Sequence, residues 1–241
     1  MDEISLVRKI NEVKERMSEK EVDIQDLLSN SGWFENRLRV AVRNREKNEK
    51  DTDTVRTVCE KPFDDLEEYY YLKLTKEDLT KLGCFPNDDE DDGATIKVCN
   101  DILKNYGYKK EWVRAKARYN TKQNLKIESL GAVLTDLMGL PFDDEIEEFH
   151  ATDDTVWVLS TEDKMLGAVG IIFTDVLKDF ATEHNIKTLA VLPSSIHEVL
   201  LVRLKNLDER EIYMDMVKEI NEAEVQEKER LSDNAYIIQN E

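Results

Sequence analysis

Residues 189–204 read LAVLPSSIHEVLLVRL and decide how the C-terminal half of the chain folds. The run 189–192 is short and continuously apolar, which is typical of a strand buried on both faces. Pro193 has no backbone N–H to give to a sheet, so we expect this strand to end there. Residues 196–204 alternate in part between apolar and polar positions, and they indicate a second strand. The stretch therefore predicts a β-hairpin or a tight strand-turn-strand unit.

The turn of this unit gathers Ser194, Ser195, His197 and Glu198, a set that invites a catalytic interpretation. Neighbouring residues of a strand point to opposite faces, so Glu198 is badly placed to orient His197 as the acid of a triad. The chain also has no GxSxG elbow. We expect the serines to cap the turn and His197 to bond a local backbone carbonyl. Ser194, Ser195 and His197 remain the candidates for a nucleophile site or a recognition site.

The overall charge narrows the classes of partner. The 241 residues carry a formal net charge of −19, and 36% of them are charged. Direct binding to phosphate backbones needs clustered Lys and Arg, so we expect no direct nucleic-acid contact. An acidic surface suits the opposite role, in which the protein competes with nucleic acid for a basic protein partner.

Metal, cofactor and membrane signals are absent from the sequence. Cys59, Cys84 and Cys99 form no CxxC pair and have no close His, so we expect no metal and no cofactor. The N-terminus lacks the apolar core of a signal peptide, and no apolar run approaches the length of a membrane span. We expect a soluble, cytoplasmic protein that does not bind membranes.

Two acidic segments are candidate binding surfaces. The segment 86–93 ends in glycine but lacks the DxDxDG spacing of a calcium loop, and we expect a solvated loop. The segment 141–153, PFDDEIEEFHATD, is the clearest linker. The binding candidates in the two segments are Asp88, Asp89, Glu90, Asp91, Asp92, Asp143, Asp144, Glu145, Glu147 and Glu148.

Apolar periodicity predicts a mixed N-terminal region over 1–140 and an α+β domain over 155–241, joined by the acidic linker 141–154. In the first region the acidic residues 64–68 suit a helix N-terminus, and a strand follows them. The other expected elements there are helices at 1–22, 100–106, 110–120 and 129–138 and strands at 38–43 and 93–98.

The second region is expected to be a β-β-α-β-β-α-β unit with a mostly antiparallel sheet. The run 167–173 predicts a strand in a hairpin, and its Gly167 and Gly170 indicate a bulge or a close backbone approach. The helix expected at 208–221 places four apolar side chains on one face: Ile212, Met216, Val217 and Ile220. The remaining elements are strands at 156–159 and 235–239 and a helix at 175–184.

Several short motifs occur in a fixed order and carry a resemblance. They are REKN at 45–48, GATI at 93–96, NYG at 105–107, WVLS at 157–160, GA at 167–168, LPSSIHEV at 192–199, VKEIN at 217–221 and LSDN at 231–234. Together they resemble an uncharacterised bacterial family, a domain of unknown function common in gut anaerobes and on mobile elements. The likeness covers residues 35–239, and the family's extra N-terminal segment is expected to be shortened in this chain.

The resemblance implies no enzyme, cofactor or catalytic residue, and its mobile-element context implies conjugation, maintenance or counter-defence. With the acidic charge, it favours a non-catalytic interaction protein that binds a basic, nucleic-acid-binding protein. The alternative is a hydrolase-like or ligand-sensing module that uses Ser194, Ser195 and His197. A third possibility is that the LPSSIHEV turn serves folding alone.

Overall fold

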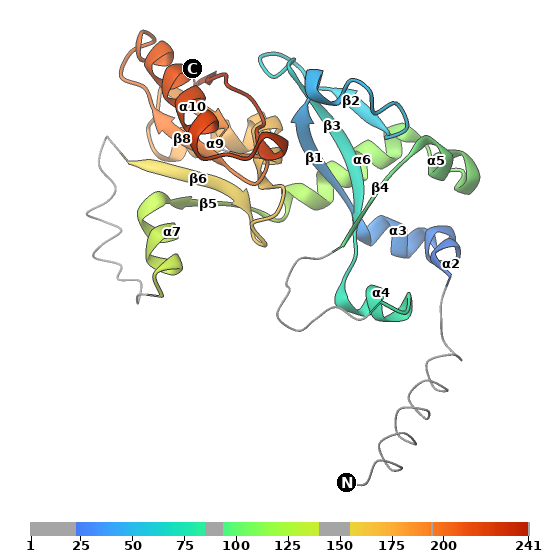
Figure 1. The fold of residues 1–241 in the computed structure, drawn as a ribbon. Coiled ribbons are helices and arrows are strands. Elements are labelled where there is room, and N and C mark those ends of the chain that lie inside the picture. The colour runs from blue at the N-terminus through green and yellow to red at the C-terminus, as the bar shows by residue number, and fades with distance from the viewer. Residues whose placement is uncertain (1–22, 85–93, 140–154, 194, 241) are drawn as a thin grey trace, which may run out of the picture.

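A computed structural model describes residues 23–84, 94–139, 155–193 and 195–240. The helix expected over 1–22 and the ten acidic binding candidates lie outside these residues, as does Ser194. The described chain combines helices with two antiparallel sheets, which confirms the α+β class. The first sheet lies on the right of Figure 1 and the second on the left.

The first sheet is built around β3 (Leu66–Lys73). β1 (Leu38–Asn44) pairs along one edge of β3, while β2 (Arg56–Val58) and β4 (Thr95–Lys97) share the other edge. Leu38, Val40 and Val42 alternate along β1 and are buried in the core. The period of two that predicted this strand is therefore the period of its buried face.

Helix α6 (Lys110–Lys122) covers the core face of this sheet and crosses behind β1 and β3 in Figure 1. α5 (Asn100–Tyr106) precedes it and ends at Gly107, whose φ of +73° suits glycine. The other elements of this half are α2 (Ile24–Ser29), α3 (Ser31–Arg37), η1 (Glu46–Asn48) and α4 (Lys76–Lys81). The helices predicted at 100–106 and 110–120 are confirmed.

The second sheet has the strand order β5-β6-β8-β7-β9, with every pair antiparallel. Its strands are β5 (Leu125–Ser129), β6 (Val156–Thr161), β7 (Thr188–Pro193), β8 (Val199–Arg203) and β9 (Tyr236–Gln239). The antiparallel pairing of β7 with β8 confirms the strand-turn-strand unit that LAVLPSSIHEVLLVRL predicts. Pro193 is the last residue of β7, as expected.

Helices pack on both faces of this sheet. α9 (Thr174–Glu183) buries Leu177 and Phe180 in the larger core, and α10 (Glu209–Ala223) buries Val217 against the opposite face. α7 (Leu130–Leu137) follows β5, and η3 (Glu227–Glu229) follows α10. Of the four apolar residues predicted on one face of α10, Val217 alone is buried, and the other three are exposed.

The strand predicted over 167–173 is wrong. Residues Gly167–Ile172 form the 3-10 helix η2, which is buried throughout. The expected close backbone approach is confirmed, because a Cβ on Gly167 would lie 2.5 Å from the Thr161 nitrogen and 2.6 Å from the His197 carbonyl oxygen. A short apolar run does not distinguish a strand from a buried helical turn. The two glycines allow η2 to lie directly on β6.

The helix start expected at residues 64–68 is also wrong. Glu67 and Glu68 lie inside β3 and are 2% and 1% exposed. Arginines from other elements neutralise them, which a local helix-dipole argument does not consider.

The two sheets share one hydrophobic core. Val40 and Val42 of the first sheet belong to the same buried cluster as Leu159 and Leu201 of the second. β5 precedes the predicted linker in sequence, yet it forms an edge of the second sheet. The division into two regions at residues 141–154 stays a prediction.

Candidate functional site

The LPSSIHEV turn connects β7 to β8 and packs against η2. The His197 backbone N–H donates to Ser195 Oγ at 3.0 Å, and the Ser195 N–H donates to the Glu198 carbonyl at 3.3 Å. Ser195 therefore caps the turn, as expected from its hydroxyl.

His197 contacts the start of η2 through its ring and β6 through its backbone carbonyl. Its Nδ1 accepts from the Leu166 N–H at 3.3 Å, and its carbonyl accepts from Ser160 Oγ at 2.8 Å. We expected the ring to bond a backbone carbonyl, whereas it accepts from a backbone N–H and so needs an unprotonated Nδ1. Leu166 has a φ of +54°, a conformation that costs energy for a residue with a Cβ. The turn thus holds a strained backbone in place, and the catalytic use of Ser194, Ser195 and His197 stays a prediction.

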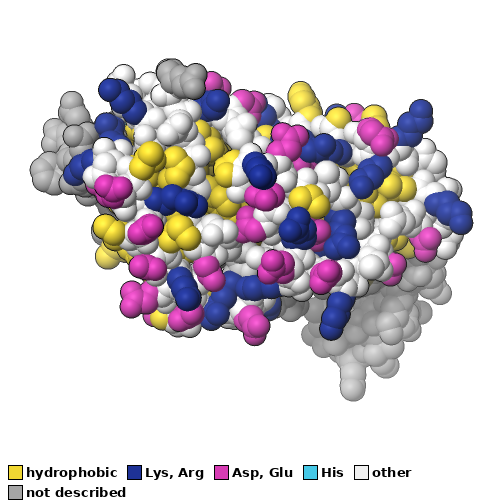
Figure 2. All heavy atoms as spheres, turned by 90° about the horizontal axis from the view of Figure 1, so that it is seen from above, with side chains coloured by type: hydrophobic (Ala, Val, Ile, Leu, Met, Phe, Trp, Pro, Cys, Tyr) yellow, Lys and Arg dark blue, Asp and Glu magenta, His cyan; other side chains and the backbone are white. Residues whose placement is uncertain are grey.

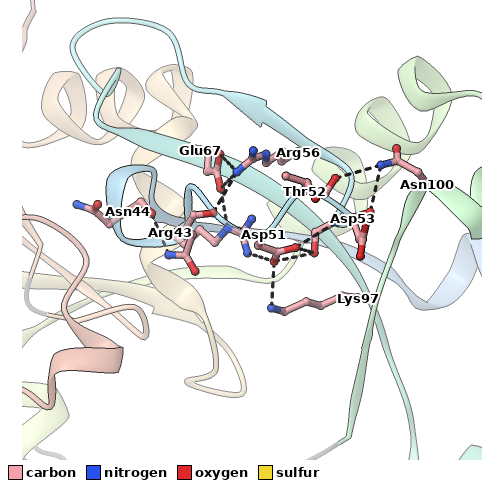
Figure 3. A network of polar contacts seen from close by, with 11 residues as sticks. Arg43, Asn44, Asp51, Thr52, Asp53, Arg56, Glu67, Lys97 and Asn100 are labelled. Carbon is pink, nitrogen blue, oxygen red and sulfur yellow. Dashed lines mark hydrogen bonds and ion pairs between the residues drawn. The ribbon is translucent and has the colours of Figure 1, made fainter.

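A second polar site lies on the outer face of the first sheet (Figure 3). Arg43 donates through Nε to Glu67 at 2.8 Å and through Nη1 to Asp51 at 2.6 Å. Arg43 and Glu67 are direct cross-strand partners on β1 and β3, an arrangement in which opposite charges attract. Asp51 also accepts from Thr54 Oγ1 at 2.9 Å. The hydrogen bond from Arg43, with those from Thr54, lowers the pKa of Asp51 well below its usual range.

This network borders an open groove of about 750 Å³. Its lining mixes both signs of charge and consists of Arg45, Glu46, Glu49, Arg56, Val58 and Glu67. Arg56 reaches Glu67 at 3.4 Å. Because Glu67 is already bound by two arginines, the network ties the segment between β1 and β2 to the sheet.

The opposite face of β3 carries a matching buried carboxylate. Glu68 Oε1 accepts from Arg118 at 2.6 Å and from Arg114 at 3.1 Å, and both arginines come from α6. Tyr70 lies nearby, and burial raises the pKa of its hydroxyl to about 12. Burial also raises the pKa of the Cys59 thiol to about 12, so Cys59 is protonated at neutral pH. Consecutive residues of one strand thus bind cations on two different faces.

A third site joins the two halves of the chain. Asp65 accepts from Tyr236 Oη at 2.7 Å, from Ser232 Oγ at 2.7 Å and from Asn234 Nδ2 at 3.1 Å. Asn44 donates to the Leu231 carbonyl at 3.1 Å. The LSDN motif at 231–234 therefore contacts Asn44, the last residue of β1, and Asp65, the residue before β3. Sequence reasoning found the LSDN motif but had no signal for these two distant partners.

The outer face of α10 carries an exposed apolar surface, as α7 does through Leu134 and Leu137. The apolar residues on this face of α10 are Ile212, Met216 and Ile220, which are 67%, 38% and 41% exposed. Figure 2 shows, on the face seen from above, exposed hydrophobic side chains in patches among interleaved acidic and basic ones. On that face the charges are mixed, so no single sign of charge covers it.

Two further properties of the part of the chain that the structure describes concern metals and membranes. No group of three or more His, Cys, Asp or Glu side chains is arranged to hold a metal ion in those residues. None of the helices described is long and apolar enough to cross a bilayer.

Of three comparisons with known proteins, only the one with family models finds a match. No curated protein and no solved structure shows significant similarity to it. A family of unknown function, DUF5688, matches residues 2–239, nearly the whole chain. The chain belongs to this family of unknown function.

Proposed function

We propose that this chain is a non-catalytic interaction protein that binds a basic protein partner. The observation that carries the proposal is the outer face of α10, where an exposed apolar stripe runs beside a ridge of carboxylates.

The stripe consists of Ile212, Met216 and Ile220, each four residues from the next. Residues at this spacing lie one above another on a helix. The helix is held to the sheet by its other face, where Val217 is buried and Tyr213 and Met214 pack beside it. The stripe is therefore free of that packing and is presented outward.

The ridge lies along one side of the stripe. Its members recur at spacings of three and four residues and are all exposed: Asp208, Glu211, Asp215, Glu219 and Glu222. Among the described residues, none of the five has an ion-pair partner. Elsewhere many cations are already paired, as Arg43 is with Glu67 and Arg118 with Glu68. The ridge therefore remains a local source of negative potential.

An apolar stripe beside an acidic ridge complements an amphipathic helix with a basic flank. Apolar side chains of such a partner would pack on the stripe, while its Lys or Arg side chains would face the ridge. The resemblance to mobile-element proteins supports a nucleic-acid-binding protein as this partner, in a counter-defence or maintenance role. The charge contribution is screened by salt, which makes binding testable through ionic strength.

The test is an affinity capture from host lysate at about 50 mM and about 300 mM salt, read by mass spectrometry. The chain is compared with the double variant Asp215→Lys and Glu219→Lys. A control with the same change of charge carries Asp179→Lys and Glu183→Lys on exposed positions of α9.

We expect the unchanged chain and the α9 control to retain a basic protein at low salt and to release it at high salt. The α10 variant should retain none. Capture of nothing at either salt, or equal capture by the α10 variant, would show the proposal to be wrong.

A further inference from the structure

The open edge of β9 presents backbone hydrogen-bonding groups, whereas the outer face of α10 presents side chains. β9 ends the sheet order and pairs with β7 alone. Beyond the ladder, the Asn240 N–H donates to the Lys187 carbonyl at 3.0 Å. In an antiparallel pair the residues that exchange hydrogen bonds alternate along the strand. Residues 236, 238 and 240 therefore direct their backbone groups to β7, and residues 235, 237 and 239 direct theirs outward.

Arg210 confirms this alternation, because its Nε donates to the outward carbonyl of Ala235 at 3.0 Å. Within the described residues, the outward N–H and C=O groups of Ile237 and Gln239 have no hydrogen-bond partner. Together they offer two donors and two acceptors in a line, which is the pattern that a further strand requires.

These groups form the floor of a groove of about 1060 Å³. The β9 segment contributes residues 234–239 to it. One wall comes from α9 through Thr174 and Lys178. The other comes from the start of α10 through Leu207, Asp208, Arg210 and Glu211. The groove therefore follows the strand edge and is open where a paired strand would lie.

The other edge of the same sheet shows what a protected edge looks like. β5 carries Lys126 and Glu128, which pair with each other at 2.7 Å. Charged side chains on an edge strand discourage pairing with another chain. β9 reads YIIQ and carries no charge. Only one of the two edges has this protection.

We propose that the groove binds a single extended peptide segment of another protein, which adds to β9 as a sixth strand. A second copy of this chain fits poorly, because its own β9 is set between the same two walls. The walls of two copies would meet before the strands came within about 4.8 Å. A peptide without such walls reaches the floor.

The charges of the walls define the peptide further. Side chains of an added strand alternate between the two walls. The α9 wall presents the exposed cation Lys178. The α10 wall presents Asp208, Glu211 and the 54% exposed Leu207, together with Arg210, whose Nε is bound to the Ala235 carbonyl. The peptide therefore alternates acidic residues, which face α9, with basic or apolar residues, which face α10. Backbone bonds supply the binding and this alternation supplies the selectivity.

The experiment is to select random heptapeptides displayed on phage against the full chain, and then to measure the labelled peptides by fluorescence anisotropy. The test variant is Gln239→Pro, which removes one outward N–H from an exposed position. Gln239→Ala is the matched control, because it removes the same side chain and keeps the N–H. Lys178→Glu tests the charge rule.

We expect the selected peptides to show the two-residue alternation and to bind Gln239→Ala as they bind the unchanged chain. Gln239→Pro should weaken binding at least about five-fold, which corresponds to the loss of one backbone hydrogen bond. Lys178→Glu should change the selected acidic positions to basic ones. The α10 variant Asp215→Lys, Glu219→Lys should bind the peptides normally, which separates this site from the proposed function.

If Gln239→Pro fails to fold, amide hydrogen exchange of the unchanged chain with and without bound peptide tests the proposal instead. A bound peptide should slow amide exchange at Ile237 and Gln239 in the unchanged chain and leave β5 unaffected. The proposal is overturned if no peptide is enriched, if Gln239→Pro binds as well as Gln239→Ala, or if the edge is protected by self-association that rises with protein concentration.

Discussion

The two sheets are stabilised by different means, although they share one core. Charges are buried on both faces of the first sheet, where Glu67 binds Arg43 and Glu68 binds Arg114 and Arg118. The central strands β7 and β8 of the second sheet bury Leu189, Val191 and Leu201 instead. Packing tolerates a change of pH or salt, whereas a buried ion pair depends on both partners remaining charged and in place. We therefore expect the first sheet to be more sensitive to the removal of a charged side chain. The second sheet should be more sensitive to the truncation of a buried apolar side chain.

The largest effect expected in the first sheet comes from Glu68→Ala. The change leaves two guanidinium groups of α6 without their carboxylate, and it opens space beside Tyr70. We expect the free energy of unfolding to fall by about 3 kcal/mol. This value is at the lower end of the range for a broken buried ion pair, because both arginines still reach solvent. Urea denaturation measures it.

The matched change in the second sheet is Leu201→Ala, which should cost about 2–5 kcal/mol through the cavity that it leaves. Its cost should be the same at low and high salt. If Glu68→Ala cost less than about 1 kcal/mol while Leu201→Ala behaved as expected, the buried charges would not stabilise the first sheet.

A smaller effect, with a pH signature, should come from Asp78→Asn at the start of α4. Burial alone would raise the pKa of Asp78, but hydrogen bonds from Arg37, Trp33 and Thr75 outweigh it and lower the pKa below its usual range. A carboxyl with a lowered native pKa stabilises the fold above its unfolded pKa of about 3.9 and loses that contribution as the pH falls below it.

We expect Asp78→Asn to cost about 2 kcal/mol at pH 7, and the difference from the unchanged chain to shrink toward pH 3. Thermal unfolding followed by circular dichroism at several pH values measures this difference. A difference that stays constant over this range would mean that the charge of Asp78 does not contribute.

The smallest effect should come from His197→Ala in the LPSSIHEV turn. The change removes one 3.3 Å hydrogen bond to the Leu166 N–H and leaves the His197 backbone bonds in place. We expect a loss of about 1 kcal/mol and no change in partner capture. Ser195→Ala should cost a similar amount. Loss of partner binding by His197→Ala with unchanged stability would instead favour the ligand-sensing alternative.

The sequence predicted those parts of the fold that depend on neighbours along the chain. Gly107 ends α5 because glycine adopts the left-handed conformation, and LAVL before Pro193 forms a strand. Predictions failed where a distant partner decides the outcome. Glu68 lies in a strand because arginines 46 and 50 residues away neutralise it. Residues 167–172 form η2 because Gly167 and Gly170 pack on β6, which a short apolar run does not reveal.

The two candidate binding surfaces, on α10 and at β9, also depend on distant contacts that the sequence does not show. The apolar residues of α10 were visible in the sequence, but both sides of this helix carry them, and only packing distinguishes Val217 from Ile212. The open edge of β9 follows from the strand order, and no local pattern predicts that order.

The position of β5 has a practical consequence for dissecting the chain. β5 pairs with β6 along its whole length, from Leu125 with Thr161 to Ser129 with Trp157. A recombinant fragment that starts at residue 155 would lack β5, and β6 would become an unpaired, apolar edge strand, or rim, of the sheet. Such a fragment is a poor choice for crystallisation and a good candidate for insolubility. A boundary placed before residue 125 keeps the rim covered, and a peptide copy of residues 125–129 added in trans is a natural reagent for rescuing the shorter fragment.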